Sequence, residues 1–126
     1  MKTSELVFNY LREQGYRPRT DERGNITFEY QNGTFIYCNN DEDKLFFQLA
    51  LPGIMQVNEG NYYIALEAIN QLNNDRKVIK GMILNNTSVW LMAEILLDRT
   101  PDVGDLIPRL LNMLMGGWNY FNEKVR

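Results

Sequence analysis

The sequence contains no histidine and only one cysteine, Cys38. Without histidine there is no Ser-His-Asp or Cys-His catalytic group, and the commonest metal ligand of proteins is missing. A zinc site would have no ligands beyond carboxylates and one thiol. A single cysteine forms no disulfide within the chain, so the sequence does not favour an oxidising compartment.

A surplus of basic residues is also missing. The chain has 13 Lys and Arg against 16 Asp and Glu, a net charge of −3. Nucleic-acid binding domains need a basic stripe to displace counterions, and membrane-surface helices need basic residues to attract anionic lipids. We therefore expect neither nucleic acid nor a membrane as a partner.

Long apolar runs and nucleotide or calcium signatures are missing as well. No stretch is long and apolar enough to span a bilayer, and the opening MKTSELVFNY lacks the apolar segment of a signal peptide. No phosphate-binding GxxxxGK[ST], no GxGxxG and no EF-hand loop occurs. These absences predict a cytoplasmic protein with no cofactor and no metal.

What the sequence does have is an ordinary globular composition, with 44% hydrophobic residues in 126. This predicts one domain, residues 1–126, with a single core. Helical spacing of apolar residues predicts helices over 3–14, over about 61–74, and from Thr100-Pro101-Asp102 to beyond Phe121. Gly116-Gly117 is a point where the last helix could bend.

The strands are predicted from alternation. Residues 26–31 and 34–38 alternate around Asn32-Gly33, the strongest short hairpin signal, which would pair Tyr30 with Phe35. A third strand over 45–51 ends or bends at Pro52-Gly53. A second hairpin, 78–84 with 89–96, turns at 85–88.

The resulting order is α-β-β-β-α-β-β-α, an α+β fold with an antiparallel five-stranded sheet packed with helices. In the second hairpin, an even loop would place Trp90 and Met92 on the face of Ile79. The last strand is apolar on both faces, which predicts that both faces are covered there.

Three groups of residues could carry chemistry, and each has a structural explanation that we prefer. Cys38 lies in a strand with no base nearby, as expected of a packed cysteine. The acidic run 41–43 suits a solvated turn better than a calcium loop. The aromatic face of the first hairpin has no interleaved basic residues, so it predicts core and not base stacking. No catalytic residue is expected, and the protein is not predicted to be an enzyme.

One face of the first three strands is half apolar, and two interpretations of it stay open. The face is either buried under a helix or is a contact surface for a partner or a second copy. In the second case the partner-binding residues would be Ile36, Cys38, Phe46, Gln48 and Ala50.

The central helix and the hairpin after it have a familiar pattern. Asn70 and Asn73 stand three residues apart at the end of the helix and precede the strand VIKGMIL. With Leu51-Pro52 closing the third strand, this resembles the YbjN-like proteins. The resemblance implies the fold of the type III secretion chaperones, which are small, acidic, mostly dimeric bacterial proteins that hold an extended partner chain. The two asparagines themselves predict amide bonds to nearby backbone, a structural clamp and not a ligand site.

Two function hypotheses follow. The first is a non-catalytic, chaperone-like or regulatory domain of bacterial type, a homodimer that binds an unidentified protein or peptide by apolar burial and edge-strand pairing. The alternative is a small-molecule-binding or enzymatic domain with a pocket between sheet and helices.

Overall fold

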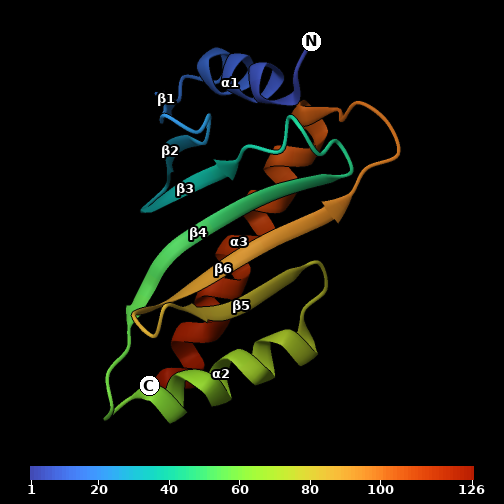
Figure 1. Ribbon diagram of the computed structural model, residues 1–126. Coiled ribbons are helices and arrows are strands. Elements are labelled where there is room, and N and C mark those ends of the chain that lie inside the picture. The colour runs from blue at the N-terminus through green and yellow to red at the C-terminus, as the bar shows by residue number, and fades with distance from the viewer.

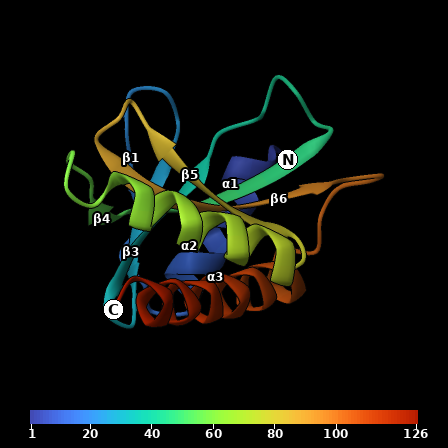
Figure 2. The same ribbon diagram turned by 90° about the horizontal axis from the view of Figure 1, so that it is seen from below.

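The computed structural model describes all residues, 1–126, as one antiparallel sheet with helices on one of its faces (Figures 1 and 2). This confirms the α+β class. The elements, in chain order, are α1 (Thr3–Glu13), β1 (Arg19–Thr20), β2 (Ile26–Tyr30), β3 (Gly33–Cys38), β4 (Phe46–Gln56), α2 (Tyr62–Asp75), β5 (Ile79–Leu84), β6 (Ser88–Leu96) and α3 (Val103–Val125).

The sheet has six strands in the order β1-β2-β3-β4-β6-β5, one more than predicted. The extra strand is β1, whose two residues pair with β2 inside a segment expected to be a loop. So short a strand carries no alternating pattern, and periodicity therefore gives no signal for it. The other elements follow the predicted order.

The first hairpin turns one residue earlier than the Asn-Gly signal predicts. Tyr30 pairs with Gly33 and Phe28 with Phe35, so the loop is Gln31-Asn32, and Gln31 has a φ of 53°. Gly33 is a strand residue whose missing side chain makes room for α3. A Cβ there would lie 3.2 Å from Cζ3 of Trp118. The pairing moves by two positions, so the aromatic face is still the core face.

β4 is the long central strand, and it continues past Pro52 to Gln56. Its pairing with β6 shifts between Leu51 and Met55, and Gly53 there has a φ of +61°. Proline is tolerated at such a bulge because the ladder is already interrupted. Pro52-Gly53 therefore bends the strand and does not end it.

The second hairpin differs from the prediction by one residue, which changes the face of one strand relative to the other. Leu84 pairs with Ser88 across a three-residue loop, and Asn85 and Asn86 both have positive φ. A one-residue slip moves every side chain to the opposite face. Trp90 consequently lies across from Met82, and not on the face of Ile79.

All three helices pack on the same side of the sheet. Figure 1 shows α3 behind β4 and β6, and Figure 2 shows α2 and α3 together on one side of the strands. Buried side chains from the helices and from alternate strand positions form a single core cluster. On β6, for example, this cluster takes Val89, Leu91 and Ala93 but not the residues between them.

α3 runs unbroken from Val103 to Val125, so Gly116-Gly117, the point where a bend was possible, does not interrupt the helix. Gly117 serves a different purpose, because a Cβ there would lie 2.4 Å from Cδ1 of Ile79. Gly81 on β5 similarly lets α2 approach, with Ile69 at 3.4 Å from a hypothetical Cβ. Near the C-terminal ends of the two helices, the hydroxyl of Tyr120 donates to Asp75.

Candidate functional site

The strands β3, β4, β5 and β6 send alternate side chains to the face that carries no helix, which we call the outer face. Figure 1 looks onto this face. Registered pairing aligns its residues in rows, for instance Ile36 with Ala50 and Ala50 with Met92. Its members include Ile36, Cys38, Phe46, Gln48, Ala50, Lys80, Met82, Leu84, Ser88, Trp90, Met92, Glu94 and Leu96.

The outer face is mostly apolar and no helix of the chain covers it. None of its apolar side chains belongs to the core cluster or packs against that cluster. Phe46 is 42% exposed and Leu96, its partner in the register, is 71% exposed. An apolar surface that continues across several strands is typical of a contact site.

A polar lane crosses the outer face, and its groups bond to one another. Asn40 Nδ2 donates to Gln48 Oε1 at 2.8 Å, and Gln48 Nε2 donates to Glu94 Oε2. Lys80 forms an ion pair with the other oxygen of Glu94. Lys80, followed by the Gln48 amide, holds the pKa of the Glu94 carboxyl below its usual value. Because these polar groups already have partners, covering them costs less than covering unpaired groups.

The five residues predicted to bind a partner come together on this face, and four of them offer surface to it. Ala50 is 0% exposed, because a short side chain between Ile36 and Met92 is covered by its neighbours. The interpretation that a helix covers the face is wrong, as is the expectation that β6 is covered on both sides. Both rested on strand patterns that do not reveal which side the helices take.

Sequence reasoning missed the β5 and β6 half of the outer face. Met82, Trp90, Met92 and Leu96 belong to it, but the one-residue error in the second hairpin placed Trp90 and Met92 with Ile79. The signal that could have found them is Asn85-Asn86. Asparagine tolerates positive φ, so two of them in sequence mark a tight hairpin turn.

Cys38 lies on the outer face as a half-buried thiol. Burial, followed by the nearby Glu94 carboxylate, raises the pKa of this thiol above its ordinary value. A raised pKa lowers the thiolate fraction and with it the nucleophilicity. The environment therefore agrees with a packing cysteine.

The chain itself occupies part of the exposed edge of the sheet at β5. Asn73 of α2 accepts from the backbone N–H of Gly81 at 2.7 Å and donates to its carbonyl at 3.3 Å. The N–H of Ile79 donates to Lys77 at 2.8 Å. The asparagine clamp is thus real at Asn73, whereas the side chain of Asn70 bonds only to Asn74.

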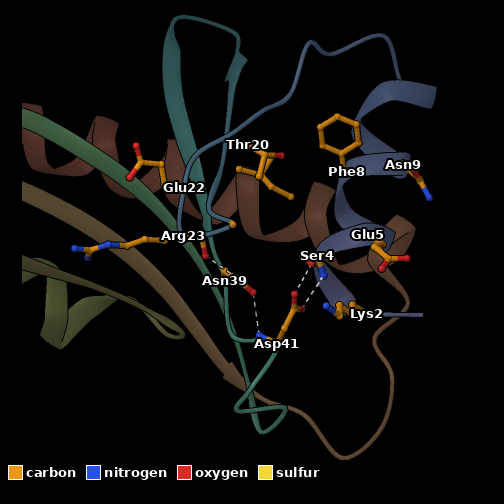
Figure 3. Close-up of a pocket in the computed structure, with 12 residues that line it drawn as sticks. Lys2, Ser4, Glu5, Phe8, Asn9, Thr20, Glu22, Arg23, Asn39 and Asp41 are labelled. Atoms are coloured by element: carbon orange, nitrogen blue, oxygen red, sulfur yellow. Dashed lines mark hydrogen bonds between the residues drawn. The ribbon is translucent and has the colours of Figure 1, made fainter.

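A cavity of about 610 Å³ lies between α1 and two loops (Figure 3). Asp41 reaches across its floor and accepts from the Ser4 hydroxyl at 2.5 Å and the Ser4 N–H at 3.2 Å. Asn39 donates to the Arg23 carbonyl at 2.8 Å and accepts from the Asp41 N–H at 3.0 Å. The acidic turn at 41–43 is therefore partly structural, because Asp41 stabilises the start of α1.

No group of three or more acidic or cysteine side chains lies close enough to hold a metal ion. None of the helices is both long enough and apolar enough to cross a membrane.

The fold has a counterpart among solved structures. No family model and no curated protein matches the sequence. A crystal structure described as "YbjN, a putative transcription regulator from E. coli" superposes with a TM-score of 0.68. The match covers 94% of this chain and 88% of that chain, at 8% sequence identity. The chain therefore has a YbjN-like fold, as the asparagine and proline pattern predicted.

Proposed function

We propose that this chain is a non-catalytic protein-binding domain, chaperone-like or regulatory, which binds a protein or peptide across the outer face of its sheet. The observation that supports this most is the outer face itself. An apolar surface formed by four strands lies opposite the helices and has no partner within the 126 residues. Covering apolar surface yields roughly 25 cal/mol per Å², so a partner that covers this face gains binding energy from the burial of apolar surface.

The face, and not the edge, is the binding surface in this proposal. Peptides that add a strand to a sheet need free backbone groups along an edge. On β5 the Gly81 backbone is bonded to Asn73 and the Ile79 N–H is bonded to Lys77. We therefore replace edge-strand pairing, which the sequence suggested, with face-to-face apolar contact.

Regulation through a protein contact agrees with the charge of the chain. The YbjN structure is described as a putative transcription regulator. A net charge of −3 disfavours direct contact with DNA, because such contact depends on neutralising phosphates. In this proposal any regulatory effect passes through a bound protein, and the single free thiol suits a reducing cytoplasm.

The test compares two variants that carry the same change on opposite sides of the molecule. Met92→Lys places a charge in the outer face, and Met113→Lys places one on α3, where Met113 is 41% exposed. Tagged wild type and variants are used to capture proteins from lysate of the native host, and the captured proteins are quantified by mass spectrometry. We expect at least one protein to be retained by wild type and by Met113→Lys, and to fall about tenfold with Met92→Lys.

Equal capture by both variants would rule out the outer face as the binding surface. Capture lost only with Met113→Lys would place the binding surface on the helical side instead.

A further inference from the structure

A second cavity lies at the end of the molecule where β4, the β5–β6 turn and the start of α2 meet (Figure 1). Its volume is about 560 Å³, and none of the outer-face residues named above lines it. We infer that this cavity binds an alkylated ammonium group, such as the trimethylammonium group of choline or of a trimethylated lysine side chain. The inference goes beyond the proposed function, since it concerns a different surface and a different class of ligand.

Two tyrosines in the first turn of α2 form the aromatic part of the wall. The rings of Tyr62 and Tyr63 stand at 89° to each other, with their centroids 6.0 Å apart. Two rings at right angles can form the corner of a box, and a cation packed into such a corner meets both π-systems. Tyr63 is 80% exposed, on the side of α2 opposite the buried residues, so the packing of the core does not account for an aromatic side chain there.

The charge of the wall favours a cation. Glu59 is the one charged residue that lines the cavity, and it takes part in no ion pair of the chain. Four other cavities, of about 320–610 Å³, each have at least one Lys or Arg in their walls. A wall with one carboxylate and no basic residue disfavours phosphates, nucleotides and carboxylic acids, and it attracts a ligand of positive charge.

The apolar part of the wall narrows the class of cation. Three of the six lining residues are hydrophobic, and the amides of Asn58 and Asn86 are the only polar groups besides Glu59 and the tyrosine hydroxyls. A primary ammonium is compact and strongly hydrated, so it loses hydration where few acceptors replace the water. An alkylated ammonium presents methyl groups instead. These pack against the ring faces while the charge interacts with the π-electrons and the carboxylate.

The loop before α2 holds this wall in place without a ligand. Asn58 Oδ1 accepts from the N–H groups of Gly60 at 2.8 Å and of Asn61 at 3.0 Å. The N–H of Val57 donates to the Thr87 carbonyl at 2.9 Å, which joins the loop to the β5–β6 turn. A preformed wall lowers the cost of ordering side chains and loops on binding.

The dipole of α2 limits the affinity. Its N-terminus is the positive end, the first turn contains no acidic side chain, and the N-cap residue Asn61 makes no capping bond. A cation near this end is therefore repelled, and contact with two rings outweighs the repulsion by a small margin. We expect a dissociation constant of about 1–10 mM.

The experiment titrates the isotope-labelled full chain with choline chloride at constant ionic strength and follows the backbone amide shifts by NMR. We expect saturable shifts confined to residues 57–63 and 86. Two further titrations act as controls for the ligand. Ammonium chloride, and the neutral analogue in which carbon replaces the choline nitrogen, should each bind at least about threefold more weakly than choline.

Variants test the ring and the carboxylate separately. Tyr63→Leu keeps an apolar side chain at an exposed site, so it should fold, and it should weaken choline binding about two- to fivefold without affecting the neutral analogue. Tyr63→Phe keeps the ring and should bind choline as wild type does. Glu59→Gln should weaken choline binding about twofold. The matched control is Phe46→Leu, at an aromatic residue 42% exposed on the outer face, which should leave binding unchanged.

A third titration, with a short peptide that carries one trimethylated lysine, distinguishes the two sources of the group. Tighter binding of the peptide would indicate a side chain of a protein, and tighter binding of choline would indicate a free small molecule.

An absence of saturable shifts up to about 100 mM choline, ten times the weakest expected dissociation constant, would overturn the inference. Equal binding of the neutral analogue would do the same, because it would show that charge is not recognised. An equal loss in Tyr63→Leu and Phe46→Leu would also overturn it. None of these results touches the outer face, so the proposed function would stand.

Discussion

At the scale of single residues, Asn73 shows how one side chain can protect a sheet. Its amide takes the place of a neighbouring strand by bonding both backbone groups of Gly81. Exposed strand edges invite pairing with other chains, and proteins block them. The sequence suggested an asparagine clamp, but it could not tell which of two asparagines reached a strand eight residues later.

Replacing Asn73 by alanine should lower the free energy of unfolding by about 1 kcal/mol, because the Gly81 backbone loses two hydrogen bonds. Asn70→Ala is the matched control, since its side chain bonds only to Asn74, and it should change stability by less than about 0.5 kcal/mol. Urea unfolding measures both. Faster amide exchange at Gly81 in Asn73→Ala alone would identify the edge as the cause, and equal losses in both variants would contradict the clamp.

Tyr37 is a buried phenol whose ionisation opposes folding. Burial, and then the nearby Asp41 carboxylate, raises the pKa of Tyr37 to about 12. A group whose folded pKa exceeds its unfolded value of about 10 stabilises fully below pH 10 and loses that contribution as the pH rises toward 12. Wild type should therefore lose on the order of 2 kcal/mol across this window.

The variant Tyr37→Phe isolates this contribution. Tyr10, Tyr16 and Tyr120 also have raised pKa values, and they titrate in both proteins. Urea unfolding at pH 9 and at pH 11 should show a smaller loss of stability for Tyr37→Phe than for wild type. Parallel losses in the two proteins would mean that Tyr37 does not carry the alkaline sensitivity.

At the scale of elements, the two neighbouring glycines of α3 have opposite roles that the sequence could not separate. A Cβ on Gly116 would meet nothing within 4 Å, whereas one on Gly117 would meet Ile79 and Leu91. Gly116→Ala should raise the free energy of unfolding by about 0.5–1 kcal/mol, because alanine is the better helix former. Gly117→Ala should be less stable than Gly116→Ala by about 1–3 kcal/mol, because the core must shift to admit the methyl group.

Thermal and urea unfolding of the two single variants checks this order. The reverse order would show that α3 can move away from β5 at little cost.

The hairpins show what a sequence pattern does and does not fix. In the first, an error of two positions in pairing kept Phe28 and Phe35 on the core face, because side chains alternate with a period of two. In the second, an error of one position assigned Trp90 and Met92 to the face of Ile79, which is the core face. Alternation shows which residues of one strand share a face. Which faces of two paired strands coincide depends on the length of the turn, and a change of one residue there reverses the answer.

At the scale of the whole molecule, the side of the sheet on which the helices gather was the decisive unknown. Each helix and most strands were predicted, yet β6 is apolar on both faces, so its pattern does not say which face is the core. That choice depends on packing among α2, α3 and the strands, with Gly81 and Gly117 permitting close approach. Such contacts join residues far apart in the chain and leave no local signal.

Truncation on the two faces of β6 should therefore cost very different amounts of stability. Leu91 is buried in the core, and Leu91→Ala should cost about 2–5 kcal/mol, because it removes packed atoms and leaves a cavity. Met92, the next residue, lies outside the core cluster, and Met92→Ala should cost less than about 1 kcal/mol in the monomer.

Urea unfolding at several protein concentrations separates the stability lost by the monomer from any stability lost through weaker assembly, because only the loss through assembly depends on concentration. A large, concentration-independent loss for Met92→Ala would make the outer face part of the fold's own core and leave no surface for a partner. A small loss that grows with concentration would instead show that the face contributes its energy between chains.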